Sequence, residues 1–310
     1  MITLQTSPKK VNYALGIDLG GTYIKSAIID SKGKIIKQYK TESYSIISPQ
    51  KVIRQIEKCI IELKKGFDRK ILGIGIGAPG IVTKGVVKYP PNFKSWKEVN
   101  FKKHFEKKFK LETEVDNDAN CAGLAELKFG FGRKYKNFIF LTLGTGIGGA
   151  IVTDGNLYRG EQNGAGEFGM MTINFNGPYC LGGNYGAVEA YLGRNYFLEN
   201  EKSQVKLLGI KIDIDDIQKL AGKNNKIARE LFKKYGFYLG VGLANYFNLM
   251  DVRTAILGGG ISNAYKYFIT ECIKTIKERS IKTIRNKFKV LKSNINNNAG
   301  VLGAAALVLY

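Results

Sequence analysis

The 310-residue sequence has only one histidine, four cysteines and one tryptophan. Few histidines and cysteines restrict the catalytic, disulfide and metal-binding chemistry that the protein can use. With His104 as the sole imidazole, neither a Ser-His-Asp triad nor another histidine-based acid–base mechanism is expected. The cysteines are far apart and form no Cys-x-x-Cys pair, which argues against a disulfide framework or a zinc knuckle. Such cysteine usage fits a reducing compartment best, so we expect a cytoplasmic protein.

Long hydrophobic runs are also missing. The longest apolar stretch, AGVLGAAALVLY at residues 299–310, is too short to cross a bilayer, and residues 1–10 lack the apolar core of a signal peptide. With 44% hydrophobic and 24% charged residues the composition is that of a globular protein. The length suffices for two lobes with separate cores, and no membrane partner is expected.

Acidic residues are scarce relative to basic ones. The 26 Asp and Glu residues face 48 Lys and Arg residues, which gives a formal net charge of +22. Such an excess can attract nucleic acid or a phosphate-rich ligand. The basic residues are spread over several segments rather than gathered in one arm, namely 32–40, 64–70, 102–110, 223–234 and 274–292. We therefore interpret the charge as a lysine-rich composition and expect no DNA partner.

Two glycine-rich stretches repeat one pattern. Residues 15–30 read LGIDLGGTYIKSAIID, and residues 141–154 read LTLGTGIGGAIVTD. Each is an apolar run, a glycine turn that carries a Thr, and a second apolar run that ends in Asp. The pattern predicts a β-hairpin with a bare turn, because glycine accepts positive φ and lets backbone N–H groups approach an anion. The repetition predicts two similar half-domains with a nucleotide between them.

Strand and helix patterns alternate along the chain, which predicts an α/β fold with mostly buried strands. Ser48 and Pro49 fit a helix N-cap and first helical position, and the apolar spacing after them predicts a helix over residues 49–66. Besides the two hairpins, strands are expected at 71–77, 85–90, 112–116 and 254–257. Further helices are expected at 98–110, 119–129, 187–200, 213–221, 224–249, 262–280 and 299–308.

Two carboxylates stand beside these motifs at the ends of strands. Asp18 precedes the first glycine turn, where it would repel a phosphate unless Mg²⁺ or its water shell lay between them. The alternative is a turn Asp that caps its own backbone. Asp118 follows Asn117 at a strand-to-helix junction, a frequent position for functional groups. There it can accept the proton of a hydroxyl that attacks a γ-phosphate, or it can simply cap the helix.

Five segments, taken in order, resemble the ROK family of repressors, open reading frames and sugar kinases, and are similar to bacterial glucokinases. They are LGIDLGGT, GIGAPG, DNDANCAGLAE, LTLGTGIGG and GAGEFG. The resemblance covers about residues 13–308 and implies the actin-like, ribonuclease H-like two-lobed ATPase fold. The lobes are expected at residues 1–117 with 295–310, and at residues 118–294. The implied activity is that of an ATP- and Mg²⁺-dependent hexose kinase, foremost a glucokinase acting on the 6-hydroxyl of glucose, and a homo-oligomer, foremost a dimer, is expected.

The resemblance also implies roles for individual residues. Asp118 is expected to be the general base, and Asp18 to hold Mg²⁺ through water. The nucleotide is expected at three glycine turns and a lysine that follows the first of them: Gly20, Gly21, Thr22 and Lys25; Gly144, Thr145 and Gly146; Gly258, Gly259 and Gly260. For Lys25 a solvent-facing position on the strand is an equally good interpretation. The sugar is expected to contact Gly77, Ala78, Pro79, Gly80, Asn92, Asn117, Asp118, Glu167 and Glu189.

The sequence departs from the family at its zinc site, for which the pattern is Cys-x-Cys-Gly-x-x-Gly-Cys-x-Glu with an additional His. Here the segment reads CLGGNYGAVE, so Gly182 and Ala187 replace two cysteines, and Met170 stands at the His position. Because Cys180 alone cannot support tetrahedral zinc, no structural zinc is expected. Other packing must hold this loop, which leaves the pose of Glu189 and the sugar preference open.

Three alternatives remain beside a glucokinase. A sugar-sensing repressor would need a helix-turn-helix domain, and about a dozen residues before the first strand are too few for one. Inorganic polyphosphate is an open alternative to ATP as the donor, because a chain of +22 attracts polyanions. The acceptor is also open to mannose, fructose or an N-acetylated hexosamine, because packing near Met170 and Ala187 is altered.

Overall fold

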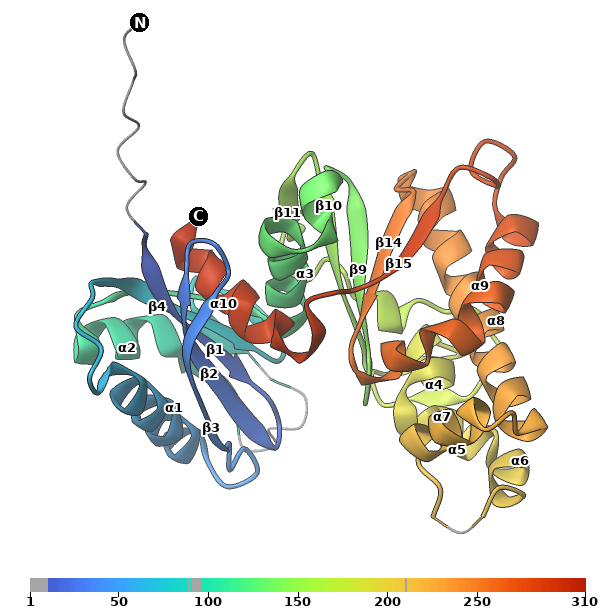
Figure 1. The fold of residues 1–310 in the computed structure, drawn as a ribbon, viewed down its shortest axis with the longest axis horizontal. Helices are drawn as coiled ribbons and strands as arrows, with labels where there is room; N and C mark the ends of the chain where they lie inside the picture. The colour runs from blue at the N-terminus through green and yellow to red at the C-terminus, as the bar shows by residue number, and fades with distance from the viewer. Residues whose placement is uncertain (1–10, 89, 91–95, 210) are drawn as a thin grey trace, which may run out of the picture. The chain divides into compact units, whose positions relative to one another are not determined.

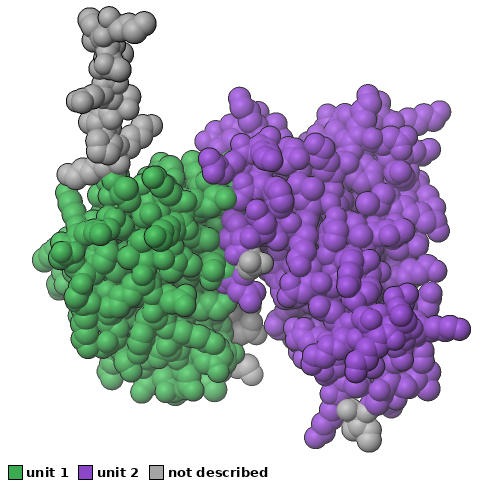
Figure 2. Space-filling view, in the orientation of Figure 1, with its two compact units in different colours: residues 1–129, 298–310 green, residues 130–297 purple. Residues whose placement is uncertain are grey.

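The computed structural model describes residues 11–88, 90, 96–209 and 211–310 (Figure 1). Asn92, expected near the sugar, lies outside the described residues. The chain divides into two compact units, Met1–Phe129 with Asn298–Tyr310, and Gly130–Asn297 (Figure 2). The helix after residue 117 belongs to the first unit by its contacts. A division of the catalytic lobes at residues 117 and 295 stays a prediction.

The first unit contains a five-stranded sheet in the order β3-β2-β1-β4-β8. The strands are β1 (Tyr13–Leu19), β2 (Tyr23–Asp30), β3 (Ile35–Glu42), β4 (Ile71–Ala78) and β8 (Glu112–Asn117). β2 pairs antiparallel with β1 and β3, whereas β4 pairs parallel with β1 and β8. A small antiparallel sheet follows β4 and consists of β5 (Ile81–Thr83), β6 (Val86–Lys88) and β7 (Glu98–Asn100).

Helices cover this sheet on both faces. They are α1 (Pro49–Lys64), α2 (Phe101–Phe109), α3 (Asp118–Phe129) and α10 (Ala299–Leu309). Side chains alternate along a strand, so Leu15 and Ile17 enter the core formed with α1 and α2, while Gly16 faces α10. A Cβ on Gly16 or on Gly75 would overlap a backbone carbonyl of α10. These glycines therefore let α10 lie directly on the sheet.

The second unit repeats the topology of the first. Its sheet has the order β11-β10-β9-β14-β15, formed by β9 (Phe138–Leu143), β10 (Ile147–Thr153), β11 (Asn156–Tyr158), β14 (Thr254–Gly258) and β15 (Lys289–Lys292). Again the hairpin strands pair antiparallel and the last two strands pair parallel. Two similar half-domains, predicted from the glycine-rich repeat, are confirmed.

Helices of the second unit form its remaining core. They are α4 (Val188–Leu192), α5 (Arg194–Asn200), α6 (Lys202–Lys206), α7 (Ile214–Gly222), α8 (Lys226–Met250) and α9 (Tyr265–Arg279). A Cβ on Gly236 would overlap the carbonyl of Phe268, so α8 and α9 pack at close range (Figure 1). Short elements complete the chain, namely β12 (Tyr179–Cys180), β13 (Asn184–Tyr185), η1 (Phe131–Lys134), η2 (Phe168–Met170), η3 (Gly260–Ala264) and η4 (Asn296–Asn298). Among the residues described, no helix combines the length and apolar character needed to traverse a bilayer.

Candidate active site

The turn between β1 and β2 is held by its own backbone and by two buried serines. The N–H of Gly20 donates to the carbonyl of Tyr23 at 3.0 Å. The hydroxyls of Ser43 and Ser45 both donate to the carbonyl of Gly21 at 2.6 Å. A Cβ on Gly21 would meet no heavy atom within 4 Å, so the outer side of the turn is open. The two serines were not predicted, because they follow β3 and no motif marks them.

The glycines of the turns differ from the expectation in their backbone angles. Among the glycines expected to bind the nucleotide, all of which are described, Gly259 alone has a positive φ, at 81°. Space rather than φ restricts Gly20, Gly146 and Gly258, whereas a Cβ on Gly21, Gly144 or Gly260 would meet no atom closer than 3.8 Å. A Cβ on Gly146 would lie 2.5 Å from the Oε2 atom of Glu189. The positive-φ argument is thus wrong for the first two turns, whereas the argument from close approach remains.

Asp18 lies at the end of β1, opposite Lys25 in the antiparallel register. Its carboxylate contacts the first turn of α10, because a Cβ on Gly300 would lie 2.5 Å from the Oδ2 atom of Asp18. Burial raises the pKa of the Asp18 carboxyl, and the Lys25 ammonium acts in the opposite direction. Carboxylate oxygen is the ligand type that Mg²⁺ prefers, so Asp18 fits the expected role at this turn.

Asn117 connects the start of α3 to the turn after β4. Its amide nitrogen donates to the carbonyl of Gly80 at 3.0 Å. Its Oδ1 atom accepts from the N–H groups of Ala119 and Asn120 at 2.8 and 3.2 Å. Asp118 Oδ1 also accepts from Ala119, at 2.9 Å. The helix cap, proposed above as the alternative role of Asp118, is therefore supplied in large part by Asn117.

Asp116 supports this junction from within the sheet. It is buried, and its Oδ1 atom accepts from the N–H of Asn117 at 2.7 Å and from the amide of Asn120 at 2.9 Å. In the β4–β8 register Asp116 pairs with Gly77, and Asn117 with Ala78. The carboxyl ends of the two parallel strands thereby bring the Gly77–Gly80 turn next to the start of α3. The role of Asp116 was not predicted.

Glu189 is anchored beside the second glycine turn. The N–H of Gly144 donates to the carbonyl of Gly146 at 3.1 Å and closes that turn. Glu189 Oε2 accepts from the N–H of Ile147 at 2.8 Å, and the Cys180 thiol lies 3.8 Å from Oε1 as a donor. Both carboxylate oxygens therefore have a fixed partner, which orients the side chain without a metal ligand set.

Glu167 lies close enough to Glu189 for their charges to interact. Burial and the Glu189 carboxylate both raise the pKa of Glu167. The neighbouring Tyr246 ring packs on Phe168 with centroids 4.4 Å apart, and burial together with Glu167 raises the pKa of Tyr246 to about 12. The two glutamates expected to bind sugar thus form one group of hydrogen-bond acceptors. Such a group suits a ring of hydroxyl donors.

The third glycine motif follows β14. A Cβ on Gly259 would overlap the carbonyl of Leu143 at the end of β9, so this turn and the second glycine turn lie at adjacent strands of one sheet. Arg194, at the start of α5, donates its backbone N–H to the carbonyl of Gly144 at 3.0 Å. Sequence reasoning missed Arg194, because no motif marks it.

The ROK family model matches residues 14–310. The chain belongs to the ROK family. A glucokinase of Thermotoga maritima is 30% identical over 307 residues, which cover 95% of this chain and 96% of the relative. A xylose repressor of Bacillus subtilis is 31% identical over 305 residues, which cover 97% of this chain and 78% of the repressor. Membership in the ROK family therefore does not by itself separate a kinase from a regulator.

Solved ROK structures share the fold. A ROK family glucokinase from Streptomyces griseus, in complex with glucose and AMPPNP, has a TM-score of 0.84 and 28% identity, with 96% of this chain and 99% of that chain covered. A ROK hexokinase from Thermus thermophilus has a TM-score of 0.80, 24% identity and a coverage of 96% of this chain and 97% of that chain. The predicted actin-like α/β fold of two similar sheets is thereby confirmed.

An apolar cluster occupies the loop where the ROK pattern would place zinc ligands. Cys180, Ala187 and Ala190 are fully buried, and Met170 and Tyr196 pack against them. A Cβ on Gly182 would overlap the sulfur of Met170. In the described part of the chain, no three Cys, His, Asp or Glu side chains gather as metal ligands. Packing of small side chains stabilises the loop. That the protein binds no zinc stays a prediction.

The predicted residues gather in two groups, one in each unit. The first unit holds Asp18, Gly20, Gly21, Thr22, Lys25, Gly77, Ala78, Pro79, Gly80, Asn117 and Asp118. The second unit holds Gly144, Thr145, Gly146, Glu167, Glu189, Gly258, Gly259 and Gly260. Thr22 and Thr145 are both exposed at the tips of their turns.

Proposed function

We propose that this ROK protein is an ATP- and Mg²⁺-dependent hexose kinase that phosphorylates the 6-hydroxyl of glucose. The observation that carries the proposal is the position of Asp118, at the first residue of α3, next to an Asn117 bonded to Gly80. Phosphoryl transfer needs positioned reactants and a group that accepts the hydroxyl proton. The glucokinases among the relatives and solved structures support this choice.

The first unit would supply the base and one phosphate turn. Asp118 would accept the proton of the sugar hydroxyl as that oxygen attacks the terminal phosphorus of the nucleotide. Asn117 and the Gly77–Gly80 turn would bind the sugar, and the open turn at Gly21 would bind phosphate through backbone N–H groups. Asp18 would hold Mg²⁺ through water, and the ion, when bound, neutralises phosphate charge.

The second unit would supply the other phosphate turn and the acceptors for the sugar. Glu167 and Glu189 would accept hydrogen bonds from sugar hydroxyls. A sugar that lacks one of these hydroxyls would leave a carboxylate without that hydrogen bond. The turn around Thr145 would bind phosphate, and Gly258–Gly260 would contact adenosine. Water competes with the sugar as acceptor, so efficient transfer to the sugar requires that water be excluded from the reacting phosphate.

A coupled assay of ADP release tests the proposal over a panel of glucose, mannose, fructose and N-acetylated hexosamines. We expect turnover with ATP and Mg²⁺, highest with glucose. Replacing Asp118→Asn removes the base and is expected to lower kcat by about 10²- to 10⁴-fold while glucose binding remains. Asp154→Asn is the matched control, because Asp154 has a φ of 51° in an exposed hairpin turn and asparagine accepts that conformation.

Two outcomes would contradict the proposal. A fully active Asp118→Asn enzyme would refute the role of this carboxylate. A folded protein that turns over no sugar of the panel would refute the kinase, and if it still binds sugar it would support a second candidate, a sugar-responsive regulator. The xylose repressor relatives, at 31% identity, are the observation that favours this candidate. Met170 alters the packing of the loop, which leaves the sugar preference of a kinase open. N-acetylated and epimeric hexoses are therefore tested as acceptors beside glucose.

A further inference from the structure

The loop of residues 170–189 does not fit the zinc site of the ROK pattern. Of the four ligand positions, all of which the structure describes, Cys180 alone carries a ligating side chain. The sulfur of Met170, at the position of the histidine, fills the space that a side chain on Gly182 would enter. Because tetrahedral zinc cannot rest on one thiolate, other contacts must fix this loop and the Glu189 carboxylate at its end.

Asn184 ties the β12–β13 hairpin to the segment before it. Its Nδ2 atom donates to the carbonyl of Met170 and to the Oγ1 atom of Thr172, both at 2.9 Å. In the antiparallel register, Asn184 pairs with Cys180. The residue opposite Cys180 is therefore anchored by hydrogen bonds.

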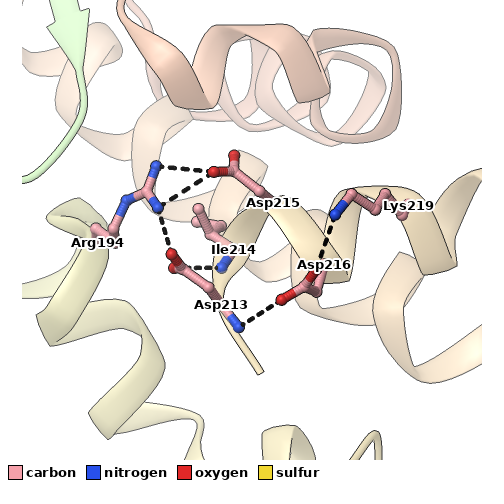
Figure 3. Close-up of polar contacts among 6 residues, drawn as sticks. All are labelled: Arg194, Asp213, Ile214, Asp215, Asp216 and Lys219. Atoms are coloured by element: carbon pink, nitrogen blue, oxygen red, sulfur yellow. Dashed lines mark hydrogen bonds and ion pairs between the residues drawn. The ribbon is translucent and has the colours of Figure 1, made fainter. Parts of the chain in front are cut away.

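Tyr196 reaches the same loop from α5. The first residue of α5, Arg194, donates its backbone N–H to the carbonyl of Gly144 at 3.0 Å. Its guanidinium Nη1 atom lies 2.6 Å from Asp213 and 3.4 Å from Asp215, at the start of α7 (Figure 3). The start of α5 is therefore fixed, and the Tyr196 ring, two residues later, packs against the apolar cluster of the loop.

The Tyr196 hydroxyl and the Cys180 thiol connect the loop to Glu189. The N–H of Leu181 donates to the Tyr196 oxygen at 2.8 Å, and the Cys180 thiol lies 3.8 Å from Glu189 Oε1 as a donor. Burial raises the pKa of Tyr196, the Leu181 N–H acts in the opposite direction, and the hydrogen bond with Cys180 and the Glu189 charge raise it further. Tyr196, Cys180 and Glu189 therefore interact as one group.

The donors of this group follow one direction. A thiol and a tyrosine hydroxyl have one proton each, so Cys180 can donate to Glu189 while its sulfur accepts from Tyr196. The thiol is a weak donor by itself, and hydrogen bonds in a chain polarise one another. Tyr196 thus fixes the Cys180 side chain and strengthens its bond to the carboxylate.

We propose that Tyr196 is a positioning residue for Glu189, that it acts through the Cys180 thiol, and that this chain of donors takes the place of zinc in the loop. The inference rests on the proposed function, because it treats Glu189 as a ligand of the sugar. Glu189 Oε2 accepts from the N–H of Ile147 at 2.8 Å, so a second fixed partner at Oε1 determines the plane of the carboxylate. The remaining lone pairs then face the sugar hydroxyls in one orientation.

Glucose binding by calorimetry and steady-state kinetics of the full chain test the inference. Tyr196→Phe keeps the ring and removes the hydroxyl, and Cys180→Ala removes the thiol. Each is expected to raise the Kd and KM for glucose about two- to tenfold, the effect of one hydrogen bond, and to leave kcat and the KM for ATP unchanged. Tyr179→Phe, at an exposed tyrosine of the same hairpin, is the matched control and is expected to bind glucose as the wild type does.

The double variant decides whether Tyr196 acts through Cys180. If it does, Tyr196→Phe has no further effect on the glucose Kd once Cys180→Ala is present. Fold-changes that multiply would overturn the path through the thiol, and glucose binding unaltered by either single substitution would overturn the whole inference. Thermal unfolding shows whether each variant is folded.

Two measurements are independent of sugar. Alkylation of Cys180 by iodoacetamide, located by peptide mass spectrometry, is expected to be faster in Tyr196→Phe than in the wild type or Tyr179→Phe, because the thiol has lost a partner. Zinc in the purified protein is expected to be substoichiometric. Equal alkylation rates, or stoichiometric zinc, would overturn the inference. If the wild type binds no sugar, the proposed function fails while alkylation still decides whether Tyr196 holds Cys180, so the two failures are distinguishable.

Discussion

At the residue scale, the position of Glu189 depends on the space that a single glycine leaves empty. The carboxylate accepts from the Ile147 backbone and the Cys180 thiol, and it occupies the space where a side chain on Gly146 would begin. Zinc ligands adjoin the corresponding glutamate in the ROK pattern, whereas here packing and two hydrogen bonds hold it. The pose of Glu189 is therefore sensitive to the second glycine turn.

Gly146→Ala tests this dependence. The added Cβ would lie 2.5 Å from Glu189 Oε2, so the carboxylate must move and lose its bond to Ile147. We expect the KM for sugar to rise at least about tenfold, which corresponds to the loss of one hydrogen bond to a charged group. Steady-state kinetics at saturating ATP measures the effect. Gly164→Ala is the control, since a Cβ there meets nothing within 4 Å, and equal KM values in the two variants would contradict the argument.

Local motifs made some site residues predictable and left others hidden. Asn117, Asp118 and the two glutamates stand in short, recognisable segments, and their roles stay predictions. Ser43 and Ser45 could not be found in this way, because they act on a carbonyl more than twenty residues earlier in the chain. Arg194 is hidden for the same reason, since its partners belong to other elements.

At the element scale, the central strands of the two five-stranded sheets were predicted, and three of their edge strands, β3, β11 and β15, were missed. β4 and β14 are continuous apolar runs with Gly turns, as expected for strands buried on both faces. β3 carries lysines between its apolar residues, and β15 has a lysine at each end. Both strands stand at sheet edges, where charged side chains discourage pairing with other chains. Their composition resembles that of a loop, so sequence alone does not reveal them.

An ion-pair group joins α1 to α2. Glu57 Oε1 lies 2.8 Å from His104 Nε2, and Glu57 Oε2 lies 2.7 Å from Lys108 Nζ. His104, the sole histidine, thus contacts this carboxylate while its side chain stays partly exposed. Burial acts to raise the pKa of Glu57, yet the hydrogen bonds from Lys108 and His104 outweigh it and the pKa is lowered. The group therefore stabilises the folded state when Glu57 is ionised.

Glu57→Gln tests that contribution through the pH dependence of unfolding. Because the pKa of Glu57 is lower in the folded state, its stabilisation is present above the unfolded-state pKa and is lost as pH falls through the folded value. We expect Glu57→Gln to lower the free energy of unfolding by about 1 kcal/mol at pH 7 and to approach the wild type only as pH falls below the lowered, folded-state pKa of Glu57. Denaturant titration measures both. Glu278→Gln, at an exposed position on α9, is the control, and a pH-independent difference for Glu57→Gln would contradict the assignment.

At the scale of the whole molecule, one topology occurs twice, and each copy carries a glycine turn between its first two strands. The repeat in the sequence was sufficient to predict this duplication, because the apolar–glycine–apolar pattern is local. The contacts that close each unit come from residues far apart in the chain, as with α10 on β1 and β4. These contacts depend on glycines in one element and on the backbone of another element that packs against them, so they cannot be found in any single segment of the sequence.

The net charge of +22 leads to a prediction about nucleic acid. Dispersed lysines bind DNA through counterion release, so any association should be independent of sequence and weaken steeply with salt. In gel-shift experiments we expect binding at low ionic strength and none at about 0.15 M salt, with or without sugar. A discrete, sugar-sensitive complex that survives 0.15 M salt and excess competitor DNA would contradict this and favour the regulator.

The C-terminal helix gives the chain a particular order of assembly during synthesis. Residues 299–309 form α10, which packs on the strand glycines Gly16 and Gly75 of the first sheet. The ribosome nevertheless makes them after all of residues 130–297. A nascent chain therefore carries an unfinished N-terminal core while the later, contiguous unit already has every residue it needs. We expect the unit encoded second to mature first, so that premature termination near residue 297 would release a chain with one finished half and one exposed to proteolysis.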